Sequence, residues 1–439
     1  MDFNVIIIGG GPGGYKTATY AASKGLSVMV AERAELGGTC LNRGCIPTKT
    51  YARFAEVVET LRDTEAYALD GVSFSFNFAK AFARKEQVVE TLRNGIATLL
   101  SAPGITLVQG TARLKDAHTV VIDEKEYTAD NIIIATGSVS KSLPIEGLDS
   151  EMVCDSDWLL STDVLPKRIC IVGAGVIGME FASILNSFGC EVCVVEFLKE
   201  CLPTLDSDIA KRLRKCLEKR GVEFYMQSAL KGAAGGKVVF ERKGKTVDVE
   251  ADKVVLAVGR KPLTGGLGLE AAGVEYSAKG IAVDDNMRTN VGSVFAIGDV
   301  NGRQMLAHAA EMQGKRAVNA IVGCGDSIRF DVMPAAVFTL PEAASVGKTE
   351  DSLKAEGVDY RCIKHYYRAN GKAVAMNETE GMLKLVTDTE GKVLGCHVYG
   401  AHAADLVQEV SALMCQDITV EKLEDITHIH PTLSEIIVG

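Results

Sequence analysis

Two cysteines, Cys40 and Cys45, have the spacing and the surroundings of a redox-active thiol pair. On a regular helix, residues five apart are offset by about 140° and by about 7.5 Å along the axis, so an unbroken helix would separate the two sulfurs. A disulfide needs Cα atoms about 4.4–6.8 Å apart, and Gly44 can loosen the chain enough to supply that distance. A helix start at Pro47 and the cation of Lys49 favour the thiolate, which is the reactive species. Two buried structural cysteines, the alternative, would not require these flanking residues.

The composition describes a large globular protein without a nucleic-acid-binding surface. The 439 residues are 47% hydrophobic and 24% charged, which allows about two to four domains. The net charge of −10 argues against nucleic-acid and anionic-membrane surfaces, because both require clustered Lys and Arg. Twelve scattered cysteines favour a reducing compartment. With no visible signal peptide, no long apolar run and no metal-ligand pattern, we expect a cytoplasmic, metal-free protein.

A strand, a glycine-rich turn and a helix stand at the beginning of the chain. The apolar run 5–8 leads into Gly9, Gly11 and Gly14 in the pattern G-x-G-x-x-G. The first glycine allows a tight turn, the second lets the backbone approach a pyrophosphate, and the third lets helix and strand pack closely. The phosphate charge then lies at the helix N-terminus. Glu32 ends the next strand, where its carboxylate can bind a ribose diol.

The same motif of strand, glycine-rich turn and helix recurs in the middle of the chain. Gly173, Gly175 and Gly178 follow a second apolar strand, and Glu196 ends the strand after the helix. In both copies the first glycine precedes the acid by 23 positions, so we predict two dinucleotide-binding units. Glu196 would repel a 2′-phosphate, which favours NAD over NADP in the second unit.

Three further strands end in glycine turns, at 131–138, 253–260 and 293–299. The first two close the two units. The third ends at Asp299, an acid at the strand end where open α/β sheets bind ligands. We expect the chain to return to the first sheet there, with Asp299 bonded to a hydroxyl-bearing linker of the first cofactor.

The glycine motifs stop near residue 330, and alternating strands with two helices predict a separate α+β domain. Near its end, His430 is the candidate acid–base group. Pro431 fixes the turn, and Glu435 lies about one helical turn away, where it can orient the imidazole.

The predicted fold class is α/β, with two Rossmann-like dinucleotide-binding domains and a C-terminal α+β domain. Helical spacing at 78–100 and 206–220 predicts two solvated helices between the strands. The predicted domains are a first dinucleotide-binding domain (1–145), a second (146–265), a return to the first (266–329) and the C-terminal domain (330–439).

These motifs resemble a known family in type and in order. Residues 37–49, the two glycine units, residues 296–299 and residues 430–435 are similar to the flavin-dependent pyridine nucleotide–disulfide oxidoreductases, over essentially the whole chain. The resemblance implies FAD on the first unit, NAD on the second, and a homodimer formed through the C-terminal dimerisation domain.

The resemblance also implies roles for individual residues. Cys40 exchanges with substrate, Cys45 lies against the flavin, and His430, held by Glu435, acts from the neighbouring subunit. Lys49 pairs near the flavin with Glu180. The implied FAD-binding residues are Gly9, Gly11, Gly14, Glu32, Lys49, Ala112, Thr136, Gly137, Ser138, Asp299, Met305, Leu306, Ala307 and His308. The implied NAD-binding residues are Gly173, Gly175, Gly178, Glu180, Glu196 and Gly259.

The pattern is most similar to the branch of this family that oxidises protein-bound dihydrolipoyl groups with NAD+. The implied partners are a lipoylated carrier protein or lipoyl domain, in a 2-oxoacid dehydrogenase complex or the glycine cleavage system. Another FAD disulfide reductase of the family, or a flavoprotein acting mainly as an assembly subunit, is the alternative. The sequence stops four residues after Glu435 and has no lipoyl module before residue 1. We therefore expect a shortened dimer edge and a lipoyl group carried by another protein.

Overall fold

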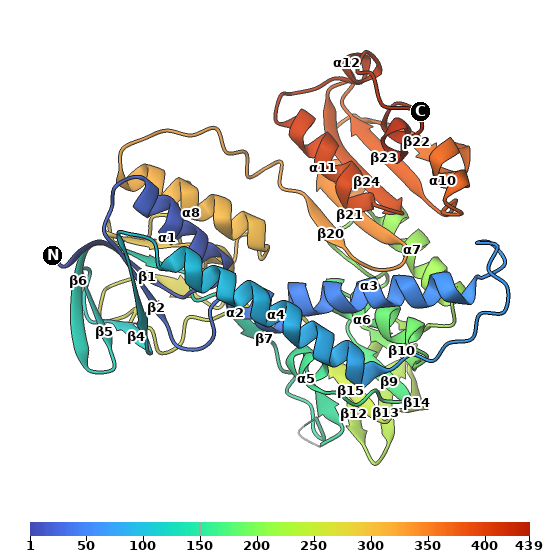
Figure 1. Cartoon of the computed structure of the whole chain (residues 1–439), viewed down its shortest axis with the longest axis horizontal. Helices are drawn as coiled ribbons and strands as arrows, with labels where there is room; N and C mark the ends of the chain where they lie inside the picture. The colour runs from blue at the N-terminus through green and yellow to red at the C-terminus, as the bar shows by residue number, and fades with distance from the viewer. Residues whose placement is uncertain (149–150) are drawn as a thin grey trace. The chain divides into compact units, whose positions relative to one another are not determined.

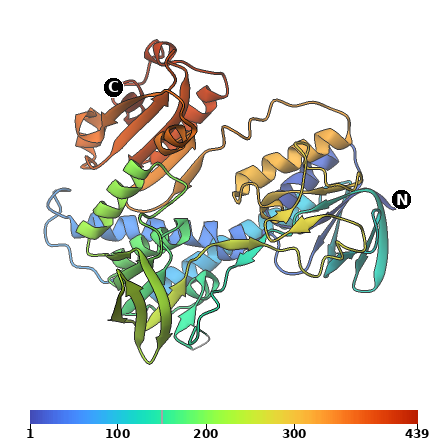
Figure 2. The same ribbon diagram turned by 180° about the vertical axis from the view of Figure 1, so that it is seen from behind.

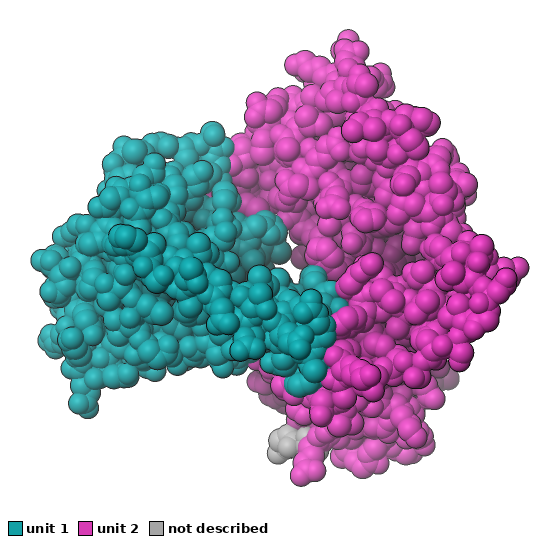
Figure 3. All heavy atoms as spheres, viewed as in Figure 1, with its two compact units in different colours: residues 1–50, 82–141, 259–328 teal, residues 51–81, 142–258, 329–439 magenta. Residues whose placement is uncertain are grey.

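The computed structural model describes residues 1–148 and 151–439 (Figures 1 and 2). The described chain forms two compact units, which Figure 3 distinguishes by colour. Unit 1 comprises residues 1–50, 82–141 and 259–328, and unit 2 comprises residues 51–81, 142–258 and 329–439. The predicted division into four segments stays a prediction.

A parallel sheet forms the core of unit 1. Its strands, in spatial order, are β3 (Ile105–Gln109), β2 (Val28–Glu32), β1 (Phe3–Ile8), β6 (Lys125–Ile134) and β19 (Val294–Ala296). The inner strands are runs of β-branched residues with almost no exposed surface, as expected for a parallel sheet covered on both faces. The chain therefore returns to its first sheet at β19.

Helices and a small antiparallel extension complete this layer. Helices α1 (Pro12–Ser23) and α8 (Ala307–Ile321) pack side by side (Figure 1). Strands β4 (Ala112–Leu114) and β5 (Thr119–Ile122) extend the sheet from β6. Helix α4 spans Phe78–Leu100, the bounds that the sequence predicted.

A second parallel sheet lies in unit 2. Its order is β11 (Glu223–Met226), β10 (Glu191–Glu196), β9 (Arg168–Val172), β15 (Lys253–Leu256) and β8 (Val153–Cys154). Helix α6 (Val176–Ser187) follows β9, and α7 (Ser207–Lys219) follows β10. An antiparallel meander lies beside this sheet (Figure 2), formed by β12 (Ser228–Ala234), β13 (Lys237–Arg242) and β14 (Lys245–Glu250).

The C-terminal part of unit 2 is an antiparallel sheet packed against α11 (Ala403–Met414). Its strands in order are β20 (Ala335–Val337), β21 (Glu342–Gly347), β24 (Val393–Gly400), β23 (Met382–Thr387) and β22 (Arg361–Tyr366). The predicted fold class is confirmed. The predicted helix number here was wrong, because the short helices α9 (Glu350–Glu356), α10 (Gly371–Ala375) and α12 (Val420–Glu424) span too few residues for periodicity to reveal them.

Within residues 1–148 and 151–439, none of the helices combines the length and the apolar character needed to cross a bilayer.

His397 is a fully buried histidine on β24, opposite Lys384 in the register. Its Nε2 donates to the carbonyl oxygen of Lys348 at 2.8 Å, and its Nδ1 has no hydrogen-bond partner among the described residues. Burial lowers the pKa of His397. The charge of Lys384 acts in the same direction, whereas the nearby carboxylates of Asp206 and Asp351 oppose it. The fold therefore favours the neutral imidazole over the charged one.

The lowered pKa of His397 predicts acid destabilisation. An unfolded histidine has a pKa of about 6.5. Below this pH, the unfolded state therefore binds a proton that the folded state does not bind. The stability is complete above about pH 6.5 and falls as the pH drops toward the folded-state pKa. We expect His397→Gln, whose amide can still donate to the Lys348 carbonyl, to flatten the dependence of the unfolding free energy on pH between about 6.5 and 5.

Denaturant unfolding of parent and variant over this pH range measures the effect. His402→Gln, at an exposed histidine, is the control and should leave the slope unchanged. Parallel curves for the parent and His397→Gln would contradict the prediction.

Candidate functional site

Cys40 and Cys45 lie on consecutive helices that break at the glycine between them. Cys40 is in α2 (Gly38–Arg43), and Cys45 is the first residue of α3 (Cys45–Arg62). A Cβ at Gly44 would stand 2.9 Å from the carbonyl oxygen of Thr39, so only glycine fits this bend without a shift. The break brings the two side chains within hydrogen-bonding distance of each other, which a continuous helix would prevent.

Asn42 stabilises the bend at Gly44 through hydrogen bonds of its side chain. Its side-chain amide donates to the carbonyl oxygens of Leu36 and Gly38, both at 2.9 Å. Its oxygen accepts two hydrogen bonds from Arg93 on α4, at 2.8 and 3.0 Å. The thiol-bearing segment is thus fixed by a side chain that sequence reasoning did not single out.

The thiol of Cys40 has a raised pKa. The hydrogen bond with Cys45 and burial raise the pKa of the Cys40 thiol, and the positive charge of Lys49 lowers it by less. Lys49 thus acts in the expected thiolate-favouring direction, but the hydrogen bond with Cys45 and burial outweigh it at Cys40. A neighbouring sulfur that accepts the hydrogen bond stabilises the protonated thiol.

The first glycine loop has the open surface that a pyrophosphate needs. A Cβ at Gly9 would stand 2.4 Å from the carbonyl oxygen of Ala135, and a Cβ at Gly14 would stand 1.8 Å from that of Gly9. At Gly11 the nearest atom would be 3.8 Å away. Helix α1 begins there without a side-chain cap, so its free N–H groups point at the open position. The loop therefore fits a dinucleotide such as FAD.

Glu32 lies at the end of β2 and ties this loop to the strand. One carboxylate oxygen accepts from the backbone N–H of Gly10 at 2.6 Å, and the other accepts from that of Ala34 at 2.8 Å. Each oxygen keeps a further lone pair, so the carboxylate is fixed in orientation and can still accept from a ribose hydroxyl.

Asp299 belongs to a relay that includes one residue the sequence analysis missed. The Ser138 hydroxyl donates to Asp299 at 2.5 Å and accepts from Arg260 Nε at 2.7 Å. Burial raises the pKa of Asp299, while the hydrogen bond from Ser138 and the charge of Arg260 act in the opposite direction. Arg260 follows Gly259 directly, and only its position after a strand-ending glycine could have indicated it.

The other FAD candidates also lie in unit 1. The Thr136 hydroxyl donates to the carbonyl oxygen of Leu263 at 2.9 Å, and Gly137 has a positive φ of 74°. Ala112 is buried at the start of β4. The run from Met305 to His308 forms the start of α8, whose first N–H groups have no side-chain cap.

The second glycine loop repeats the first. A Cβ at Gly178 would stand 2.0 Å from the carbonyl oxygen of Gly173, whereas one at Gly175 would meet nothing within 4 Å. Glu196 accepts from Ala174 N at 2.5 Å and from Leu198 N at 2.7 Å. The loop is therefore open for a second pyrophosphate at the uncapped start of α6, and its residues fit NAD.

Glu180 and Gly259, also implied to bind NAD, have hydrogen-bond partners within the protein. Glu180 is buried on α6, where it accepts from the backbone N–H of Phe338 at 2.9 Å. Gly259, with a φ of 101°, belongs to unit 1, where its carbonyl oxygen accepts from Lys141. Their contacts with NAD and the pairing of Lys49 with Glu180 stay predictions.

His430 and Glu435, the pair that the sequence singled out, lie within hydrogen-bonding distance of each other in unit 2. His430 Nδ1 lies 2.8 Å from Glu435 Oε1, and Thr432 N donates to the other oxygen at 2.9 Å. These two hydrogen bonds lower the pKa of Glu435. The His430 side chain is 80% exposed. Its Nε2 has no partner in the part of the chain that the structure describes, so the arrangement presents a proton acceptor outward.

The fold and the residues together define an oxidoreductase with two dinucleotide loops, a dithiol and an exposed histidine paired with a glutamate. Residues 3–314 match the family model of pyridine nucleotide-disulphide oxidoreductases, and residues 333–439 match the dimerisation domain of that family. The chain belongs to the pyridine nucleotide-disulphide oxidoreductase family, and it is an enzyme that uses FAD and NAD. The C-terminal match supports a homodimer.

Several characterised proteins are similar to the whole chain. A dihydrolipoyl dehydrogenase of Mycobacterium tuberculosis is 38% identical, covering 99% of this chain and 96% of that protein. A leghemoglobin reductase of Glycine max is also 38% identical, covering 99% and 86%. Among solved structures, the HOCl-induced flavoprotein disulfide reductase RclA of Escherichia coli has a TM-score of 0.88 at 28% identity, covering 99% and 98%. The resemblance deduced from the motifs is confirmed.

Gly11→Ala and Gly14→Ala separate cofactor binding from folding. A methyl group at Gly11 has room in the protein but occupies the space a pyrophosphate would enter. We expect its unfolding free energy to change by less than about 0.5 kcal/mol while bound flavin is lost. At Gly14 the methyl group meets backbone and should destabilise the fold by about 1–3 kcal/mol.

Flavin absorbance per chain and thermal unfolding measure these two effects. A full complement of flavin in Gly11→Ala would show that the loop does not bind the pyrophosphate.

Proposed function

We propose that this enzyme is a dihydrolipoyl dehydrogenase, which oxidises dihydrolipoyl groups on a carrier protein with NAD+. The observation that carries the proposal is the pairing of Cys40 with Cys45 across a helix break, in one chain with an outward-facing His430. The 38% identity with a dihydrolipoyl dehydrogenase over 99% of the chain supports it.

In the proposed site, FAD is held by the glycine loop at Gly11, by Glu32 and by the Asp299 relay. NAD is held by the loop at Gly175 and by Glu196. When bound, the flavin supplies the route by which an electron pair passes from a dithiol to nicotinamide. The chain's own residues then have to bind the carrier's dithiol and move its protons.

The proposed thiol chemistry starts from the oxidised Cys40–Cys45 pair. His430 removes a proton from one substrate thiol, and the resulting thiolate attacks Cys40 Sγ. The Cys40–Cys45 bond breaks, and Cys45 leaves as a thiolate. The second substrate thiol then attacks the substrate sulfur of the mixed disulfide, which closes the lipoyl ring and breaks the bond to Cys40, and its proton passes to the departing Cys40 sulfur. Two electrons and the substrate protons thus pass to the protein.

His430 is proposed to act on the Cys40 pair of a second copy of this chain. Its imidazole is mostly exposed, and the dimerisation-domain match places it in the family's dimer-forming segment. The hydrogen bond to Glu435 fixes the proton on Nδ1, so Nε2 is free to accept the substrate proton.

The wider setting is part of the same proposal. The carrier is a lipoyl domain or lipoylated protein of a 2-oxoacid dehydrogenase complex or the glycine cleavage system, and the scattered cysteines favour the cytoplasm. The similarity to a leghemoglobin reductase and to RclA supports one alternative, a different disulfide reductase of the family. The other alternative is an assembly subunit. Steady turnover of dihydrolipoamide with NAD+ would favour a dihydrolipoyl dehydrogenase over both of these alternatives.

Cys45→Ser tests the assignment of the two thiols. After anaerobic reduction by two electrons, the parent should develop a long-wavelength absorbance shoulder from a thiolate lying against the flavin. We expect Cys45→Ser to lose this shoulder and to keep its flavin, because the serine hydroxyl is not ionised. Cys40→Ser is the matched variant and should retain it. A shoulder that survives in Cys45→Ser would refute the assignment.

His430→Gln tests the proposed base. We expect dihydrolipoamide turnover to fall about 10²–10⁴-fold, while NADH oxidation by an artificial acceptor changes little, because only the first reaction needs the substrate proton removed. His402→Gln, at another exposed histidine, should leave both rates near the parent values. Equal losses of the two activities in His430→Gln would remove this histidine from the mechanism.

A further inference from the structure

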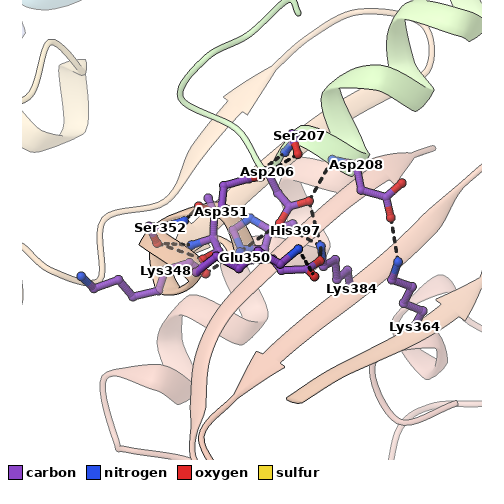
Figure 4. A network of polar contacts seen from close by, with 12 residues as sticks. Asp206, Ser207, Asp208, Lys348, Glu350, Asp351, Ser352, Lys364, Lys384 and His397 are labelled. Carbon is purple, nitrogen blue, oxygen red and sulfur yellow. Dashed lines mark hydrogen bonds and ion pairs between the residues drawn. The ribbon is translucent and has the colours of Figure 1, made fainter. Parts of the chain in front are cut away.

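A buried network of ion pairs joins the part of unit 2 that contains the second parallel sheet to the part that contains the C-terminal antiparallel sheet (Figure 4). Lys384 on β23 has a fully buried side chain, and its Nζ lies 2.9 Å from each carboxylate oxygen of Asp206. Glu350 at the start of α9 also pairs with Lys384. Burying these charges costs several kcal/mol per ion before pairing, and well-packed apolar residues often serve stability equally well. Stability alone is thus a poor explanation for the pair.

Asp206 is the hub of this network. Besides Lys384, its carboxylate accepts from the backbone N–H groups of Asp208 and Glu350, each at 3.1 Å. The first of these bonds caps α7, and the second reaches α9. Both oxygens therefore have two partners, and the carboxylate cannot shift without breaking bonds to three elements.

The segment 197–206 connects this hub to the second glycine loop. Leu205 N donates to the carbonyl oxygen of Leu202, and Leu202 N donates to that of Ala174, both at 2.9 Å. Ala174 lies between the first two glycines of the loop and also donates to Glu196. One end of the segment is thus fixed by the buried lysine, and its middle is bonded to the backbone that would face NAD.

The segment is partly buried and partly lines a surface hollow. Cys201, Leu202 and Leu205 are buried in the core of unit 2. A cavity of about 300 Å³ lies against the same segment and is bounded across from it by Thr349 and Asp351. Glu200 also ties the middle of the segment to Arg214 on α7, at 2.7 and 3.0 Å, whereas Asp206 holds the C-terminal end of the segment.

We propose that Lys384 is a positioning residue for NAD. Its ion pair with Asp206 holds the segment 197–206 against the loop Gly173–Gly178, so that the C-terminal sheet sets the affinity of a nucleotide site it does not line. This inference rests on the proposed placement of NAD at the loop around Gly175.

Lys384→Met tests the role, because methionine keeps the length and flexibility of the chain without its charge. We expect the dissociation constant for NADH to rise at least about tenfold, with bound flavin unchanged. The KM for NAD+ should rise in parallel, while kcat at saturating NAD+ stays within about twofold. Lys364→Met is the matched control. Lys364 also reaches the first turn of α7, through Asp208 at 2.7 Å, but its side chain is 33% exposed, and both constants should stay near the parent values.

The double variant Asp206→Asn/Lys384→Met separates positioning from stability. Glu350 keeps its ion pair with Lys354 at 2.7 Å, so removing the charges of Asp206 and Lys384 leaves no unpaired buried ion, and the Asn oxygen can still cap α7. We expect its thermal unfolding midpoint to recover relative to Lys384→Met while NADH binding stays weak. NADH affinity that returns to the parent value with the midpoint would overturn the proposal, as would unchanged NADH affinity in a folded Lys384→Met.

Gly175→Ala distinguishes failure of this inference from failure of the proposed site. If Gly175→Ala loses NADH binding and Lys384→Met does not, only the positioning role fails. If Gly175→Ala binds NADH as the parent does, NAD does not lie on this loop, and both the placement and the positioning role fall.

Discussion

The organisation of both dinucleotide units depends on a buried glutamate that binds two backbone N–H groups. Glu32 accepts from Gly10 and Ala34, and Glu196 accepts in the same way from Ala174 and Leu198. A charged carboxylate is expensive to bury unless its oxygens are satisfied. The two hydrogen bonds meet that requirement and at the same time fix the glycine loop beside the strand end. The sites thus owe their shape to a polar contact within the apoprotein.

The thiol pair depends instead on a local interruption of helical structure. Gly44 interrupts what would otherwise be one helix, and Cys45 begins the next. The long helix α3 then carries Lys49 one turn further, so the cation and the two sulfurs stay together. The raised pKa of Cys40 shows that, in the dithiol, the neighbouring sulfur outweighs that cation. A positive charge at the helix start therefore cannot by itself make Cys40 the thiolate.

The sequence predicted those features whose causes are local. Glycine spacing, strand runs and the short range from His430 to Glu435 lie within a few dozen residues, and each limits the backbone directly. The relay through Arg260 and the anchoring of Asn42 by Arg93 join residues 122 and 51 positions apart, and no local pattern marks such pairs. The predicted solvated helix at 206–220 was wrong in one respect. Its cap, Asp206, is buried by Lys384, a lysine placed in a strand that otherwise reads as apolar.

The C-terminal part of the chain contains two groups with different proposed roles, His430 and Lys384. His430, the proposed base, lies near the end of the chain with an exposed side chain, and Glu435 holds its imidazole through the contact at Nδ1. Such a base becomes selective only when another surface excludes water from it, which a second copy of the chain would do. Lys384 already has its partner within unit 2 and needs no second copy. Under the two proposals, the same segment of sequence would contribute one group that acts outward on another subunit and one that acts inward on a nucleotide loop. Damage to the dimer should impair the first function and spare the second.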